Sequence, residues 1–373
     1  MRKLRGPLIA ALSLAIGALA GMPASAKPVT DCPLRDAPFS VDSPLIDILL
    51  SPAAKGIVET ATGRALDKGP PRFVGTTPPT FAAILSLRKA SMFTGIKAEA
   101  LPDIDARLRK LPVTAEDRAA RCARYDNDVP TFKLQAGKPH ILLFEKINGF
   151  RDGPSVDAAH AVFVAMAKRK GWDLVATDKA GAINPATLKQ FDAVIWNNVS
   201  GDVLTLSQRT AFQQFLQRGG GFVGVHGAAG DPSYFWDWYA DTLIGARFEG
   251  HPMSPQFQEA RIAVDRSSPL AVGLPAEWRM TDEWYSFSTN PRKAGAKVVL
   301  SLDESTYSPV GPMNTDLRMG DHPLAWTNCI GKGRMFYSAI GHRPETYSQA
   351  EYVTLLETAL AWAATDRKAC SAG

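Results

Sequence analysis

Histidines and carboxylates recur in polar motifs of the second half of this 373-residue chain, where they could transfer protons or bind a metal. Four of the six histidines lie in such motifs, each expected just beyond a strand: His226, His251, His322 and His342. A lone histidine is usually structural, but four in polar motifs indicate a shared site. We predict that the catalytic residues are His226, His342, Asp282 and Glu283.

The same side chains could instead hold a divalent metal, the one cofactor that we consider. The candidate ligands are His226, His251, His322 and His342. Asp321 precedes His322, and Glu345 lies three residues after His342, a spacing that would put both on one face of a helix. The spacing is not that of the H-E-x-x-H metal motif. The alternative is a hydrogen-bonded polar cluster that binds sugar hydroxyls.

Aromatic residues crowd the same motifs and indicate a carbohydrate ligand. An aromatic face suits the apolar side of a pyranose, while carboxylate, amide and guanidinium groups bind its hydroxyls. Any single tryptophan or tyrosine could equally fill the core. The predicted substrate-binding residues are Arg151, Asn198, Trp236, Tyr239, His251, Trp284, Tyr285, Asp321, His322 and Glu345.

Alternating strands and helices must position these side chains. Continuous apolar runs predict buried strands over 141–144, 172–176, 193–196 and 222–225, with helices over 156–170 and 205–218 between them. Further strands fit 261–264, 298–301, 324–327 and 335–339, and a closing helix fits 350–364. This pattern predicts an α/β fold with a doubly wound, mostly parallel sheet. Ligands bind beyond the carboxyl ends of such strands, here at residues 148–152, 197–198 and 226–229.

The first 26 residues resemble a secretory signal peptide. Arg2, Lys3 and Arg5 precede the apolar stretch 8–20, which is too short to span a bilayer, and an Ala-Ser-Ala cleavage site occupies 24–26. We therefore expect a secreted, periplasmic protein with no membrane span after cleavage. The net charge of +5 falls to +2 without these residues, so the composition gives no support for a nucleic-acid partner.

Export to an oxidising compartment would allow the four cysteines to form disulfides. None of them forms a C-x-x-C motif, so a zinc ribbon is not indicated. Of the three pairings, we favour Cys32–Cys122 and Cys329–Cys370, because each pair then lies within one region of the chain.

Residues 27–137 predict an α-helical extension. Ser43-Pro44 and Ser51-Pro52 are helix-start signals, and Thr114 with Asp117 resembles a capping box. No catalytic constellation occurs there. The chain therefore divides into a signal peptide (1–26), a helical extension (27–137) and an α/β domain (138–373).

The α/β domain resembles the ThuA-like (trehalose utilisation) family. The segment 220–229, which reads Gly-Gly-Phe-Val-Gly-Val-His-Gly-Ala-Ala, matches the family signature, and ordered blocks follow it from Trp236 to Tyr347. The resemblance implies a flavodoxin-like fold of the class I glutamine amidotransferase type and a role in disaccharide catabolism through 3-keto sugars. This sequence departs from the family pattern in its first loop, which reads Phe150-Arg151-Asp152-Gly153 where the family has Phe-Arg-His-Asp.

Two hypotheses follow. The first is an exported hydrolase or lyase that cleaves a disaccharide or 3-keto-glycoside by His/Asp/Glu acid–base chemistry. A base would remove the proton beside the keto group and the glycosidic bond would then be eliminated. Glutaminase chemistry is not expected, because His226 stands where an amidotransferase needs a cysteine. The second hypothesis is a non-catalytic sugar-binding or assembly protein. The oligomeric state is left open.

Overall fold

The structure is a computed structural model in which residues 28–370 are described. The predicted signal peptide and its cleavage site therefore lie outside the described residues. Among the described helices, none is long and apolar enough to cross a membrane.

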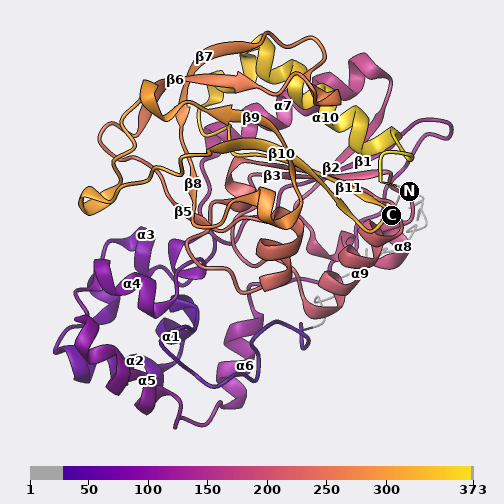
Figure 1. The fold of residues 1–373 in the computed structure, drawn as a ribbon. Helices are drawn as coiled ribbons and strands as arrows, with labels where there is room; N and C mark the ends of the chain where they lie inside the picture. Colours follow the sequence, from indigo (N-terminus) through magenta and orange to yellow (C-terminus); the bar gives the residue numbers. More distant parts are fainter. Residues whose placement is uncertain (1–27, 371–373) are drawn as a thin grey trace, which may run out of the picture.

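A nine-stranded sheet organises the larger part of the molecule and confirms the predicted α/β fold (Figure 1). Its strand order is β2-β1-β3-β4-β11-β10-β9-β6-β7. The strands from β2 to β11 are parallel, and antiparallel pairs continue the sheet to its β7 edge. A separate ribbon pairs β5 with β8. The strands are β1 (His140–Phe144), β2 (Asp173–Thr177), β3 (Ala193–Asn197), β4 (Gly221–Val225), β5 (Phe248–Gly250), β6 (Phe257–Val264), β7 (Glu277–Glu283), β8 (Ser286–Phe287), β9 (Lys297–Leu302), β10 (Pro323–Ile330) and β11 (Gly333–Ser338).

Helices cover both faces of the sheet. α7 and α10 contact one face, and α9 contacts the other, as the crossover connections of a parallel sheet require (Figure 1). The sequence starts these helices with local signals. Asp152 caps α7, and Thr205 with Gln208 forms the predicted capping box of α9. The helices of this part are α7 (Gly153–Lys170), α8 (Pro185–Leu188), α9 (Leu206–Gln217) and α10 (Ala350–Thr365).

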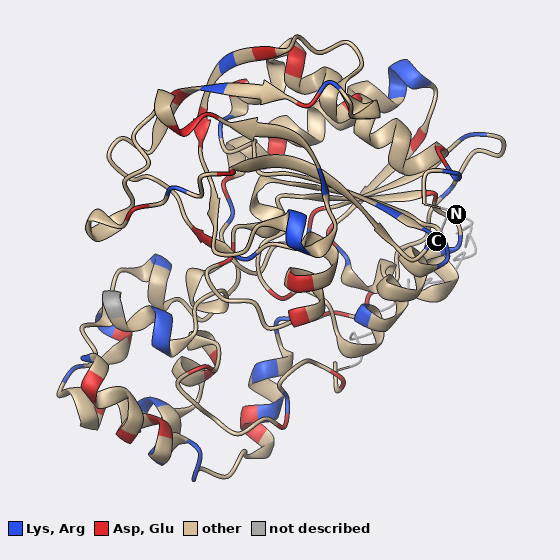
Figure 2. Ribbon diagram, viewed as in Figure 1, with Lys and Arg blue, Asp and Glu red and all other residues tan. Residues whose placement is uncertain are grey.

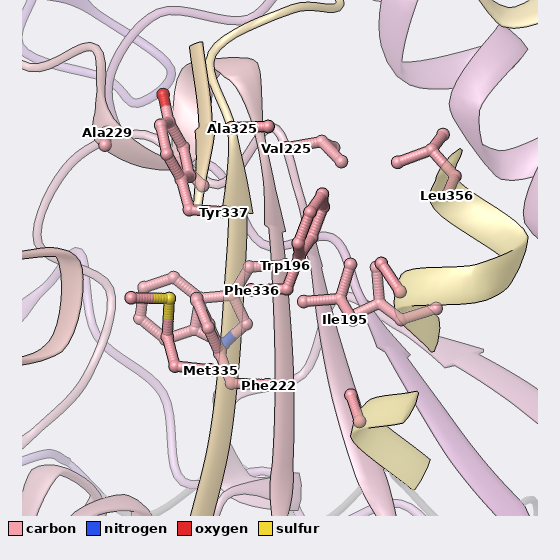
Figure 3. Packing of buried hydrophobic residues seen from close by; sticks show 14 of the residues in the cluster. Ile195, Trp196, Phe222, Val225, Ala229, Ala325, Met335, Phe336, Tyr337 and Leu356 are labelled. Atoms are coloured by element: carbon pink, nitrogen blue, oxygen red, sulfur yellow. The ribbon is translucent and has the colours of Figure 1, made fainter. Parts of the chain in front are cut away.

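Side chains of alternating direction on β3, β4 and β11 build the core (Figure 3). Trp196 stacks on Phe212 of α9, at 5.3 Å between ring centroids. Its neighbour Ile195 points to the opposite side, where Leu356 of α10 lies (Figure 3). Because both faces are covered, these strands are apolar throughout, which is why their sequences predicted them.

The N-terminal segment forms a helical lobe below the sheet in Figure 1. Backbone hydrogen bonds join it to two loops of the α/β part, from Thr80 N to Asn148 O at 3.0 Å and from Ser233 N to Ile84 O at 3.1 Å. A Cβ added to Gly149 would overlap Ile84, so this glycine allows the close approach. The helices of the lobe are α1 (Leu45–Leu50), α2 (Pro52–Thr62), α3 (Pro71–Val74), α4 (Leu87–Thr94), α5 (Leu101–Leu108) and α6 (Ala115–Cys122).

Both expected disulfides are present. Cys32–Cys122 ties the start of the lobe to α6, and Cys329–Cys370 ties β10 to the C-terminal segment. Charged residues of both signs are interspersed over the lobe and the α/β part (Figure 2).

Candidate active site

Three strand ends deliver a histidine–glutamate cluster. His226 follows β4, Glu283 ends β7, and His342 follows β11 by four residues. His226 has a left-handed backbone with φ of 41°, which is uncommon for a residue with a Cβ and is typical of functional turns. Gly341 has a φ of 135°, and there is no space for a side chain at this position. An added Cβ would lie 2.5 Å from the Tyr347 hydroxyl and 3.2 Å from His226 Cβ. The backbone thus brings the two histidines together.

We call His226, Glu283 and His342 the triad, because one atom of each converges on the same point. Glu283 Oε2 lies 3.0 Å from His342 Nδ1 and 3.4 Å from His226 Nε2. His226 Nε2 lies 3.2 Å from His342 Nδ1. Two imidazoles and one carboxylate therefore form a compact triangle, and this donor set could hold a metal ion.

The ring of His226 is fixed in one orientation. Nδ1 lies 2.8 Å from the Ala339 carbonyl oxygen, which can only accept, so Nδ1 carries the proton. Nε2 faces the other two members of the triad, where it presents a lone pair when the ring is neutral and donates to Glu283 when the ring is protonated. Tyr285 stacks on the ring at 4.2 Å between centroids, so its orientation is supported on a second side.

Glu283 is a buried carboxylate whose two oxygens face several hydrogen-bond donors. Its Oε1 accepts from Gln256 Nε2 at 2.5 Å and lies 3.1 Å from His251 Nδ1. Burial alone would raise the pKa of Glu283. Hydrogen bonds from His226 and His342 and the charge of His251 outweigh burial and hold its pKa well below its ordinary value. Glu283 is therefore ionised at neutral pH.

His342 lies at the mouth of the cluster. Burial disfavours its charged form, but the hydrogen bond to Glu283 raises the pKa of His342 above the ordinary 6.5. The Ser155 hydroxyl lies between the carbonyl oxygen of His342 and the carboxylate of Asp152, and its single proton is shared between these two acceptors. Asp152, which replaces the histidine of the family pattern, thus acts as a helix cap that helps to hold the His342 backbone.

Asp282 positions the loop that carries His342. Its Oδ1 and Oδ2 accept from the backbone N–H groups of Gly341 at 2.9 Å, His342 at 3.1 Å and Arg343 at 3.2 Å, and from the Thr346 hydroxyl at 2.9 Å. Burial raises its pKa, although these donors oppose the shift. Because its oxygens are engaged with the protein, its place in the site is that of a positioning residue.

Two exposed phenylalanines flank His342, and we call Phe150 and Phe257 the rim phenylalanines. Their rings lie 5.9 Å and 5.2 Å from the His342 ring, between centroids. They are 37% and 39% exposed, which is unusual for side chains of this size. Phe81 of the N-terminal lobe lies against Phe150 at 5.1 Å, so the lobe supports one side of the rim.

The remaining predicted residues divide into two groups. Tyr285 and His251 adjoin the triad as described, and Asn198 lies behind it, accepting from Gly227 N at 3.2 Å. Trp284 is fully buried and donates to Gln258 O. The half-buried Trp236 stacks on the buried Tyr239 and packs against Phe212 of α9. These three indole and phenol rings pack against protein.

Four predicted residues are not brought to the triad. Both ring nitrogens of His322 are engaged, with Glu304 and with the Tyr285 carbonyl, each at 2.8 Å. Asp321 pairs with Arg292, and Arg151 pairs with Asp157 at the surface. Glu345 is exposed and turns to Arg343, because His342 precedes the helical turn Pro344–Ser348 and the expected spacing on one helix face does not arise.

Sequence reasoning passed over the rim phenylalanines and Gln256. Phe150 stands in the loop 148–152 that the sequence had marked as a ligand-binding segment. Phe257 begins strand β6 and carried no signal, because exposure at a strand end depends on what lies across from it.

The triad lies within the part of the chain that matches a known protein family. A family model described as "ThuA: Trehalose utilisation" matches residues 140–363. A solved structure of a ThuA-like protein from Bacteroides uniformis ATCC 8492 is 27% identical, with a TM-score of 0.53, and the match covers 63% of this chain and 95% of that one. One from Parabacteroides merdae ATCC 43184 is 19% identical, with a TM-score of 0.46, covering 61% and 91%. No curated protein matches this chain.

Proposed function

Because the chain belongs to the ThuA family, we propose that it is an exported enzyme that cleaves the glycosidic bond of a 3-keto disaccharide or a related keto-glycoside. The observation that carries this proposal is the juxtaposition of a buried, ionised glutamate with histidines at an aromatic rim. The two disulfides support export, because such bonds persist in oxidising compartments.

Glu283 can prepare a histidine to act as a base. His251 Nδ1 and His342 Nδ1 both face the Glu283 carboxylate, and an ionised carboxylate only accepts hydrogen bonds. With the proton on Nδ1, the Nε2 atom of each ring has the lone pair that general-base catalysis needs. The side chains of His251 and His342 are 22% and 12% exposed, so solvent-borne ligands can reach them.

The keto group makes proton removal feasible. A base takes the proton from the carbon beside the carbonyl, and the electron pair moves into an enolate. The enolate then expels the glycosidic oxygen at the next carbon, and that oxygen takes up a proton to leave as an alcohol. Water adds to the resulting unsaturated keto sugar. No oxidant or reductant is needed. The rim phenylalanines would pack on the apolar face of the sugar ring.

The direct test uses nitrophenyl 3-keto-glucosides, with the matching glucosides without the keto group as controls. We expect nitrophenol release from the keto compounds alone, and deuterium uptake beside the carbonyl in heavy water. We expect His251→Gln to lose this activity and His160→Gln to retain it. His160 is a matched control, because it pairs with Glu145 at 3.0 Å outside the triad. Sugar binding without release from any keto-glycoside would refute the proposal and favour a non-catalytic sugar-binding protein.

A further inference from the structure

We propose that His226 Nε2, Glu283 Oε2 and His342 Nδ1 together bind one divalent transition-metal cation. The metal site consists of protein side chains and does not depend on any substrate. Its catalytic use rests on the proposed function above. The three ligand atoms come from the ends of three different strands, so the fold holds them in place before any ligand arrives.

The spacing of the three atoms is that of metal ligands. Ligands at the usual Zn–N and Zn–O distances of about 2.0–2.1 Å lie ~3.3–3.4 Å apart around a tetrahedral ion. Around an octahedral ion of similar size they lie ~3.0 Å apart. The observed separations are 3.0, 3.2 and 3.4 Å. The triangle therefore fits one face of a metal coordination shell without rearrangement.

The count of protons in the triad points the same way. In a neutral ring His226 has its proton on Nδ1, so its Nε2 presents a lone pair, and the carboxylate oxygen Glu283 Oε2 presents another. In neutral rings, one proton on His342 Nδ1 would have to serve both acceptors, while His226 Nε2 and Glu283 Oε2 repel each other at 3.4 Å. A divalent cation that replaces that proton satisfies all three lone pairs together.

Outer partners are arranged as around known metal ligands. A metal-binding histidine usually donates its other N–H to a carbonyl or carboxylate, which fixes the ring and raises its basicity. His226 donates in this way to Ala339 O at 2.8 Å. The second oxygen of Glu283 accepts from Gln256 and His251, and Asp282 fixes the backbone of His342.

The donor set selects the ion class. Two imidazoles and one carboxylate favour Zn²⁺, Fe²⁺, Co²⁺ or Mn²⁺ over Mg²⁺ and Ca²⁺, which prefer oxygen ligands. Three protein ligands leave coordination positions open, as in catalytic sites. Such an ion would act as a Lewis acid on the keto oxygen and so favour the enolate. His342 is then a ligand, and His251, oriented by Glu283, is the remaining candidate base.

The test measures metal binding without any substrate. The purified full chain is stripped with a chelator and titrated with ZnCl₂ by calorimetry and with CoCl₂ by visible absorption. We expect one ion per chain, a visible Co²⁺ band of four- or five-coordinate type, and a rise in the unfolding temperature with Zn²⁺. We expect Glu283→Gln and His342→Ala each to lose all three signals.

Two further variants locate the ion. His160→Gln should bind as the wild type does, because it lies outside the triad. His251→Gln should keep the one-to-one stoichiometry with an affinity about 10- to 100-fold lower, as for the loss of an outer partner. Circular dichroism of each metal-free variant shows whether it folds. If His342→Ala does not fold, Glu283→Gln still tests the site, because it nearly preserves the volume of the side chain.

Absence of stoichiometric binding, or equal binding by the wild type and both triad variants, would overturn the inference. A protonated histidine pair that binds no ion is one such outcome. Keto-glycoside cleavage by the metal-free protein would overturn the catalytic use and leave the proposed function intact. One-to-one metal binding at the triad without cleavage of any keto-glycoside would overturn the proposed function and leave the metal site intact.

Discussion

Asp231 is a buried carboxyl group from which we expect a measurable pH dependence of stability. Its Oδ1 and Oδ2 accept from Ser200 Oγ at 2.6 Å and Gly201 N at 2.7 Å. Ser200 Oγ in turn accepts from Phe150 N at 3.0 Å. Burial raises the pKa of Asp231 from 3.8 to about 7, against the two hydrogen bonds. This carboxyl therefore supports the loop of a rim phenylalanine in its protonated form.

The sign follows from proton linkage. Between pH 3.8 and about 7 the folded chain holds a proton on Asp231 that the unfolded chain has lost. Stability is therefore greatest below pH 3.8 and is lost as the pH rises through about 7. The difference between the two pKa values, at ~1.4 kcal/mol for each pH unit, corresponds to about 4 kcal/mol in the free energy of unfolding.

Asp231→Asn tests this reasoning, since the amide resembles the protonated acid at every pH. We expect the variant to lack the contribution of about 4 kcal/mol that the wild type loses between pH 4 and pH 8. Urea unfolding of both proteins across this range measures the difference. Asp103→Asn is the control, because its side chain is 72% exposed and its ion pair with Arg107 contributes no more than ~0.5 kcal/mol. Parallel pH profiles for the wild type and Asp231→Asn would refute the argument.

Three further predictions concern the rim, the lobe and their junction. Replacing either rim phenylalanine by alanine should raise KM for a keto-glycoside by about 2- to 13-fold at nearly unchanged kcat, as expected for a stacking contact of ~0.5–1.5 kcal/mol; unchanged KM in steady-state kinetics would contradict this. Replacing Cys32 and Cys122 by serine should lower the free energy of unfolding by about 4–5 kcal/mol, since the disulfide spans 90 residues; an unchanged urea midpoint would count against it. Gly149→Ala should cost ~1–3 kcal/mol, because the added Cβ overlaps both Ser200 Oγ and Ile84 of the lobe. Gly56→Ala, which has open space in α2, should be neutral or stabilising by up to ~1 kcal/mol in the same assay.

The sequence predicted the parallel half of the sheet because its strands are buried on both faces. A short continuous apolar run such as that of β3 is typical of a strand that is buried on both faces. The β7 edge strand was not predicted. Its residues alternate between exposed and buried and are mostly polar, so only pairing with β6 identifies them as a strand. The chemistry of Asp282 and Glu283 predicts them as site residues, but the sequence does not predict the strand that presents them.

The limits of sequence reasoning at the site have a physical origin. His226 follows β4, whereas His322 immediately precedes β10 and so does not lie beyond a strand as expected. His226 turns its Nε2 to the triad, and His322 has both ring nitrogens engaged elsewhere. The difference comes from Glu304, which lies 18 residues before His322 and bonds its Nδ1. Hydrogen-bond partners that distant cannot be read from local spacing. Likewise, nothing in the sequence distinguishes the exposed Phe257 from the buried Trp284, because exposure depends on the whole fold.

The helical lobe contacts the rim of the candidate site through Phe81. Thr80, Ile84 and Ser86 of the lobe contact the two loops that follow β1 and β4. Other contacts of the N-terminal segment reach the loop and helix that follow β3, such as Leu206 N to Asp31 O at 2.9 Å. The loop that follows β1 carries Phe150, whose ring lies between Phe81 of the lobe and His342 of the triad. The family match begins at residue 140, so the surface that backs Phe150 is contributed from outside it. A change in the lobe that moves Phe81 would therefore act on the rim directly, while the triad, held by β4, β7 and β11, would keep its geometry.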